Sequence, residues 1–176
     1  MYSIDHLDSV RPLQGIPQSS IGAPLPLILA AEGSLAVAFL LELRDPAWDG
    51  TSIHIVDHRT SADPAAILTF RGVHAHILGP PNDEAFEGHP LAERGLKPYG
   101  AFEILGSSWI RAMERMNRVH EYHSPAPFQQ LRHVVLAFHD STFEVAAREF
   151  SVLTAQGPLL SLLPQMSKLL ALADAV

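Results

Sequence analysis

A chain of 176 residues has the size of one domain, and its 47% apolar content can form a buried core and is too high for disorder. The chain carries 12 basic and 19 acidic residues, a net charge of −7, which argues against nucleic acid and anionic membrane surfaces as partners. The absence of cysteine excludes disulfides, thiol nucleophiles and cysteine-ligated metals, so a metal site would need His, Asp or Glu ligands.

Residues 1–26 are rich in Pro, Gly and Ser, and this composition predicts an extended N-terminal arm on the surface. Residues 27–176 are expected to form a single domain. The first residues lack the basic start and apolar segment of a signal peptide, and the most apolar stretch, residues 25–43, is interrupted by Pro26 and by charged residues. We therefore expect a cytoplasmic protein without a membrane span.

Several short segments have the pattern of β-strands. Apolar runs at residues 27–30 and 35–43, separated by a polar turn, predict a β-hairpin; a single helix over 35–43 is the alternative, because Ala and Leu dominate there. Alternating apolar residues predict a strand over 52–56. A longer strand over 67–78 follows, with Gly72 as a candidate bulge.

Residues 79–98 form a long predicted loop with a short helix over 83–86, and long loops in compact domains are often functional. A strand is predicted over 99–105. Gly106-Ser107-Ser108 then supplies a turn and an N-cap for a helix over 109–119.

The last third of the chain predicts two strands, at 133–139 and 142–152, and a leucine-rich helix over 159–173 that Pro164 should kink or divide. The element order favours an α+β fold, with an antiparallel sheet, a central helix and the C-terminal helix packed against the sheet. Four apolar residues of that helix could dock on the chain's own sheet or on a second copy, which would make a homodimer: Leu159, Leu163, Met166 and Leu170.

His74 and His76 are the sharpest local pattern, because residues two apart on a strand project from the same face. Two neutral imidazoles on one face suit a divalent metal ion. Asp83, Glu84 and His89 follow in the next loop and could complete its ligands, or the same groups could hold a small polar ligand. The alternative interpretation is that the histidine pair faces the core or its rim and is held by backbone carbonyls.

A second candidate group follows in Phe138-His139-Asp140-Ser141-Thr142-Phe143-Glu144. His139 is the candidate general base, and Glu84 is the candidate carboxylate beside it. Asp140 and Ser141 are interpreted as turn-closing residues, since neighbours on a strand point to opposite faces and cannot form a Ser-His-Asp relay. Glu144 is interpreted as solvated.

The remaining polar residues have simpler interpretations. Three histidines after the central helix are interpreted as surface or capping groups: His120, His123 and His133. A stripe of arginines on that helix is interpreted as a solvated face that could also contact a small anion: Arg111, Arg115 and Arg118.

The runs Gly79-Pro80-Pro81-Asn82-Asp83-Glu84-Ala85-Phe86-Glu87-Gly88-His89-Pro90-Leu91 and Leu131 to Glu144, with Gly106-Ser107-Ser108-Trp109-Ile110 between them, resemble segments of a small bacterial protein family without an established activity. The resemblance covers the middle of the chain and implies a bacterial origin, with no catalytic assignment.

Two functional hypotheses follow from the residues. The first is a His/carboxylate site for a divalent metal ion or a small polar ligand, with His139 as a base. The second is a non-enzymatic binding or accessory protein that acts through protein–protein contacts.

Overall fold

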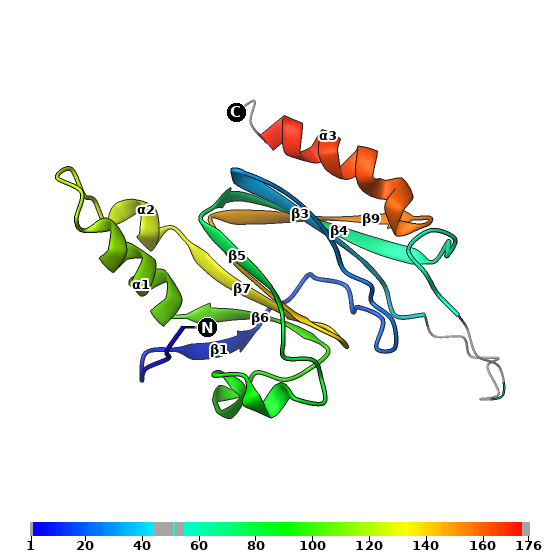
Figure 1. Cartoon of the computed structure of the whole chain (residues 1–176), viewed down its shortest axis with the longest axis horizontal. Helices are drawn as coiled ribbons and strands as arrows, with labels where there is room; N and C mark the ends of the chain where they lie inside the picture. Colours follow the sequence, from blue (N-terminus) through cyan, green and yellow to red (C-terminus); the bar gives the residue numbers. More distant parts are fainter. Residues whose placement is uncertain (1, 44–50, 52–54, 174–176) are drawn as a thin grey trace.

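Two antiparallel β-sheets form the centre of the computed structural model, which describes residues 2–43, 51 and 55–173 (Figure 1). Sheet I has five strands in the order β1 (Ser9–Pro12), β6 (Gly100–Leu105), β7 (Arg132–Ala137), β8 (Thr142–Ala147) and β5 (Ala75–Gly79). Sheet II has four strands in the order β2 (Leu27–Ala31), β3 (Gly33–Leu40), β4 (Pro64–Val73) and β9 (Glu149–Gln156).

The chain passes directly from one sheet to the other twice, from β4 to β5 and from β8 to β9. In sheet II β4 pairs with β9, and in sheet I β5 pairs with β8. The chain changes sheets at Gly72, which has a φ of 60°, and at Arg148, whose N–H donates to the carbonyl of Arg71. Bends of this kind form the corners of β-sandwiches. The single strands expected over 67–78 and 142–152 are therefore wrong, since each is two strands in different sheets.

The core between the sheets is built from both inner faces. Phe39 of sheet II packs on Phe138 with ring centroids 5.2 Å apart, and Phe70 packs on Phe143 at 5.9 Å. Leu, Val and Ala side chains fill the remaining space: Leu35, Val37, Ala66, Leu68, Val134, Leu136, Val145 and Ala147.

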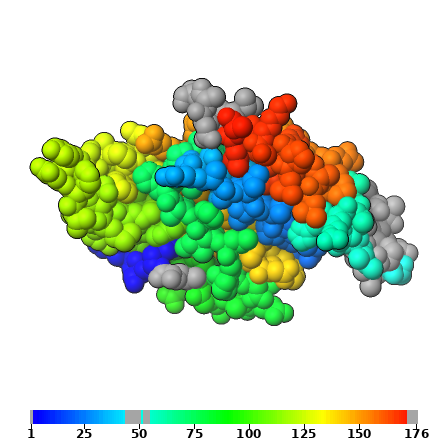
Figure 2. Space-filling view, turned by 45° about the horizontal axis from the view of Figure 1, so that its top comes forward, coloured from blue at the N-terminus to red at the C-terminus, as the bar shows by residue number. Residues whose placement is uncertain are grey.

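The outer face of sheet II is covered by the C-terminal segment, which consists of a 3-10 turn, η3 (Leu159–Leu162), and helix α3 (Leu163–Ala173) (Figures 1 and 2). Four of its apolar side chains are buried against β3 and β4: Leu159, Leu162, Met166 and Leu170. The apolar face of this helix thus packs on the chain's own sheet, and the homodimer stays a prediction. Pro164 lies in the first turn of α3, where its missing N–H costs no helical hydrogen bond.

The outer face of sheet I is covered by the loop 80–98 and by the N-terminal residues. The loop contains two 3-10 turns, η1 (Phe86–Gly88) and η2 (Ala92–Arg94). A short helix was expected over 83–86, and η1 begins at the last residue of that range. Its buried side chains pack with Tyr2 and Ile4: Phe86, Leu91 and Leu96. Two helices between β6 and β7, α1 (Ser108–Asn117) and α2 (Ala126–Gln129), lie at one end of sheet I (Figure 1).

An α+β fold with antiparallel sheets is confirmed, with two sheets where one was expected. The hairpin is confirmed as β2 and β3, so the helix considered over 35–43 is wrong. Helix α1 spans Ser108–Asn117 with Ser107 as its N-cap, where a helix over 109–119 was expected. The strand expected over 52–56 falls mainly on positions outside the described residues. Within the described chain, no helix has the length and apolarity needed to cross a membrane.

Candidate functional site

The residues expected to form one metal site lie apart from one another. His74 stands at the corner before β5, with its ring centroid 5.4 Å from that of Phe128, and His76 is exposed on β5. Asp83 follows β5, so the length of this strand separates it from His74. His89 is buried elsewhere, in the loop over sheet I. Over the described part of the chain, no group of three or more His, Asp or Glu side chains is arranged to hold a metal ion.

Three of the predicted site residues, Asp83, Glu84 and His139, lie near one another at the surface. Asp83 accepts a hydrogen bond from the Tyr99 hydroxyl, and its Oδ2 lies 3.9 Å from Nε2 of His139. Nδ1 of His139 lies 2.9 Å from Oδ1 of Asp140, and this hydrogen bond raises the pKa of His139. The negative charge of Glu84 adds a small contribution in the same direction. His139 therefore lies among carboxylates. Glu84, the carboxylate expected beside it, is exposed.

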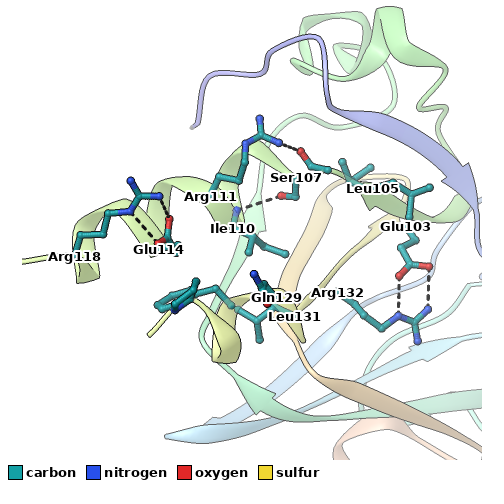
Figure 3. Close-up of a pocket in the computed structure, with 14 residues that line it drawn as sticks. Glu103, Leu105, Ser107, Ile110, Arg111, Glu114, Arg118, Gln129, Leu131 and Arg132 are labelled. Carbon is teal, nitrogen blue, oxygen red and sulfur yellow. Dashed lines mark hydrogen bonds and ion pairs between the residues drawn. The ribbon is translucent and has the colours of Figure 1, made fainter. Parts of the chain in front are cut away.

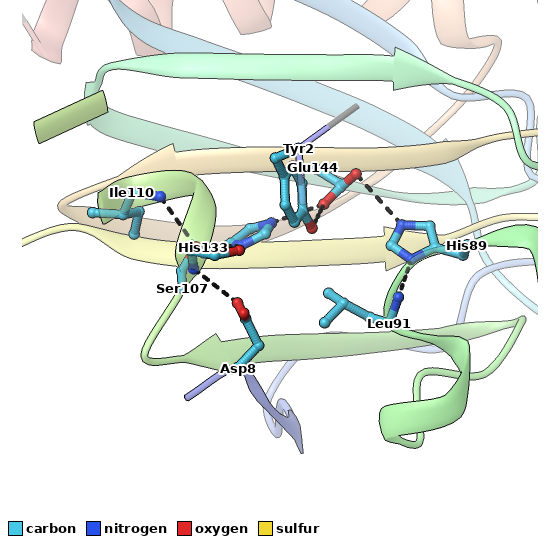
Figure 4. Close-up of polar contacts among 9 residues, drawn as sticks. Tyr2, Asp8, His89, Leu91, Ser107, Ile110, His133 and Glu144 are labelled. Carbon is cyan, nitrogen blue, oxygen red and sulfur yellow. Dashed lines mark hydrogen bonds and ion pairs between the residues drawn. The ribbon is translucent and has the colours of Figure 1, made fainter. Parts of the chain in front are cut away.

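A different set of polar side chains is buried against the outer face of sheet I, around the carboxylate of Glu144 (Figure 4). Its Oε2 accepts hydrogen bonds from the Tyr2 hydroxyl at 2.6 Å and from Nε2 of His133 at 2.9 Å. Nε2 of His89 faces Oε1 across 3.5 Å. Glu144 is 2% exposed, His133 0% and His89 3%, so this cluster is removed from solvent.

The carboxylate of Glu144 is ionised. Burial raises its pKa, but the hydrogen bonds from His133, His89 and Tyr2 outweigh burial and bring it down to about 2. The phenol of Tyr2 responds in the opposite direction, since burial and the neighbouring negative charge raise its pKa and keep it protonated. The cluster is thus one buried anion that accepts hydrogen bonds from Tyr2 and His133 and is faced by Nε2 of His89.

The hydrogen bonds also assign the tautomers of both histidines. Nδ1 of His89 accepts the N–H of Leu91 at 3.1 Å, so its Nε2 carries the proton that faces Glu144. His133 donates from Nε2 to Glu144, and its Nδ1 lies 2.9 Å from Oγ of Ser107. The rings of Trp109 and Tyr2 hold the His133 ring edge-on, with centroids 5.0 and 5.5 Å away.

Ser107 connects this buried cluster to a pocket. Its Oγ accepts the N–H of Ile110 as the N-cap of α1, so its own proton is available to Nδ1 of His133. The residue lines a cavity of about 420 Å³ bounded by α1, α2 and the ends of β6 and β7 (Figure 3). A volume of this size is within the range of small-molecule sites.

The walls of this pocket combine apolar surface with paired charges. Apolar side chains come from β6, α1, α2 and the residues next to α2 and β7: Ile104, Leu105, Ile110, Pro125, Phe128 and Leu131. Three arginines and two glutamates also line it: Arg111, Arg118, Arg132, Glu103 and Glu114. Arg118 pairs with Glu114 at 2.7 Å, Arg132 pairs with Glu103 at 2.8 Å, and these pairs lower the pKa of both carboxyls. Arg111 pairs with Asp5, which lies outside the lining, at 2.5 Å, so each of the three arginines has a carboxylate partner.

The interpretation of two residues of the buried cluster from the sequence was wrong. Glu144 was expected to be solvated and His133 to be a surface or capping group, but both are buried. Strand β8 is covered on both faces along its whole length, so the alternation that exposes every second residue does not apply. The signal that could have found Glu144 is a single ionisable residue inside an otherwise apolar run, whereas His133 directly follows Arg132 and has no such signal.

No protein-family model, curated protein or solved structure matches this chain. The resemblance to a bacterial family therefore stays a prediction, and the functional argument depends on geometry.

Proposed function

We propose that this protein binds a small organic anion with an apolar body in the pocket between α1, α2 and the ends of β6 and β7. The observation that carries the proposal is the lining itself, in which three arginines border an apolar wall within an acidic protein, each of them ion-paired but partly exposed. An anion gains from the guanidinium donors that these pairs leave open, and a hydrocarbon body gains from leaving water against Ile110, Phe128 and Leu131.

Arg118 and Arg111 of α1 are the groups we expect to meet the anionic end. The side chain of Arg118 is 61% exposed although it pairs with Glu114, so donors remain for a ligand. Arg111 is held in place by the carbonyl of Gly106 and the carboxylate of Asp5, which orients its guanidinium in advance.

Hexanoate is a suitable probe, because it joins one carboxylate to an apolar chain. We expect it to shift the amide NMR signals of pocket residues such as Ile110 and Leu131. The Arg118→Ala variant should bind it about tenfold more weakly, because a hydrogen bond to a charged group is lost. Hexanamide, which has the same body without the charge, should bind the wild-type protein more weakly than hexanoate.

Arg115 offers the matched control, since it lies on α1 between the two pocket arginines and does not line the pocket. The Arg115→Ala variant removes the same charge from the same helix and should bind hexanoate like the wild type. Equal losses in both variants would show a general effect of helix charge and would contradict the proposal. Filling the pocket with Ile110→Trp should abolish the shifts.

A divalent-metal site at His74, His76, Asp83 and His89 remains a separate hypothesis from the sequence, and the separation of these residues gives it no geometric support. Protein–protein contact as the main function likewise stays an alternative. Thermal-shift measurements with Zn²⁺, Mn²⁺ and Fe²⁺ on untagged protein test the metal hypothesis, which predicts stabilisation that His76→Ala removes.

A further inference from the structure

We infer that Ser107 is a nucleophile that hydrolyses carboxylic esters bound in this pocket, with His133 as its base and Glu144 as the residue that positions the base. The inference rests on the proposed function, because the substrate is taken to occupy the same pocket. The juxtaposition that carries it is a serine that lines the pocket, an imidazole hydrogen-bonded to its hydroxyl and a buried carboxylate behind the imidazole (Figure 4).

The three residues come from separate parts of the chain. Ser107 ends the turn after β6, His133 lies on β7, and Glu144 lies on the neighbouring strand β8. Two distances of 2.9 Å link them, from Ser107 Oγ to His133 Nδ1 and from His133 Nε2 to Glu144 Oε2. The same order of hydroxyl, imidazole and carboxylate activates serine in hydrolases of unrelated folds, where Nε2 faces the serine; here the two imidazole nitrogens are exchanged.

The protonation pattern meets the requirement for a base. In neutral His133, Nε2–H donates a hydrogen bond to ionised Glu144, so the Nδ1 lone pair points to Ser107 and can accept its hydroxyl proton. The N–H of Ile110 already donates to Ser107 Oγ at 3.2 Å, and the N-terminus of the ten-residue helix α1 lies directly behind it. Both favour the negative charge that develops on this oxygen as its proton leaves.

The neighbouring serine lacks these features and is a built-in comparison. Ser108 has the same exposed fraction as Ser107, 5%, but its Oγ has no hydrogen-bond partner among the described residues. No imidazole takes its proton, so only Ser107 is expected to react.

The reaction balances with water as the second substrate. Ser107 Oγ bonds to the ester carbonyl carbon while its proton moves to His133 Nδ1. The carbon–oxygen bond to the alcohol then breaks, and the leaving oxygen takes that proton, which leaves an acyl group on Ser107. Water attacks the acyl carbon, gives a proton to Nδ1, and Ser107 is released with its proton restored as the carboxylic acid departs.

A fluorophosphonate probe tests the nucleophile directly, because a serine oxygen displaces its fluoride and stays bound to phosphorus. Mass spectrometry of the labelled wild-type protein should place the modification on Ser107 and not on Ser108. The Ser107→Ala variant should be unlabelled and should lose hydrolysis of 4-nitrophenyl butyrate, whereas Ser108→Ala should retain both. Mapping on the wild type keeps the test valid even if removal of the N-cap unfolds the Ser107→Ala variant.

Glu144→Gln tests the positioning role, since it keeps the shape of the side chain. Its labelling rate should fall at least tenfold while its affinity for hexanoate stays at the wild-type value, a separation that a merely structural role would not produce. Absence of labelling at Ser107, equal labelling of Ser108, or wild-type reactivity in Glu144→Gln would overturn the inference.

The two proposals fail in distinguishable ways. If hexanoate binds as expected and Ser107 stays unmodified, the nucleophile is overturned and the anion pocket stands. If Ser107 is modified and hydrolyses the ester but hexanoate causes no shifts, the anion pocket is overturned and the nucleophile stands.

Discussion

His139 and His133 lie at opposite ends of the same strand region and have opposite environments. His133 is fully buried between Ser107 and Glu144, whereas the imidazole of His139 is 36% exposed beside Asp140. The sequence prediction kept His139 as the base and set His133 aside, because a histidine next to a carboxylate is visible in sequence. The partners of His133 lie 26 and 11 residues away, so nothing local identifies them.

The imidazole of His139 should titrate above its ordinary pKa of 6.5, since the hydrogen bond to Asp140 favours its cationic form. A raised folded-state pKa contributes stability below pH 6.5 that is lost as the pH rises through the folded value. A ring-proton NMR titration checks the shift. Asp140→Asn should lower this pKa more than Asp83→Asn does, because Asp83 is the weaker cause; an unchanged pKa in Asp140→Asn would contradict the assignment.

At the scale of single elements, the sequence predicted the helices and strands whose stabilising contacts are local in the chain. Helix α1 was predicted because Ser107 caps it and the turn before it is marked by Gly106. Strand β3 has both faces covered, so its apolar residues are continuous, and this explains why a helix over 35–43 remained an alternative. Helix α2 has only four residues and no side-chain cap, and no signal predicted it.

The corner between β4 and β5 was not predicted, because the alternation of side chains continues through it and only the pairing partners change. Those partners, β9 and β8, follow more than sixty residues later, and long-range pairing is not readable from local periodicity. Gly72 was recognised as irregular, but its role in turning the strand depends on Arg148, which packs where a side chain would stand.

Gly72→Ala should therefore destabilise the protein by about 2 kcal/mol or more. Its φ of 60° disfavours a Cβ, and an added Cβ would lie 2.7 Å from Cγ of Arg148. Gly79→Ala, at the end of β5 with no atom within 4 Å of its added Cβ, is the matched control and should change the free energy of unfolding by less than about 0.5 kcal/mol. Urea unfolding measures both, and equal effects would show that the corner tolerates a side chain.

At the scale of the whole molecule, both the arrangement of the sheets and the buried cluster depend on which segments pack on which face. Sheet I is covered on both faces only because the loop 80–98 and the N-terminal residues pack on its outer side. The same packing buries Glu144 among Tyr2, His89 and His133, which come from the N-terminus, the loop and β7. The sequence could indicate each segment, but which segment covers which face is decided by their combined packing.

Acid should weaken the fold through this cluster. The pKa of Glu144 is lowered from 4.5 to about 2, so its contribution to stability is present above pH 4.5 and is lost as the pH falls toward 2. The shift corresponds to at most about 3 kcal/mol. Glu144→Gln should be less stable than the wild type at pH 7 and should lose less stability between pH 4.5 and 2, as measured by urea unfolding at each pH. Glu149→Gln, on exposed β9, should keep the wild-type pH dependence. If Glu144→Gln lost as much stability in acid as the wild type, the carboxylate would not be the anion that joins the N-terminus and the loop to sheet I.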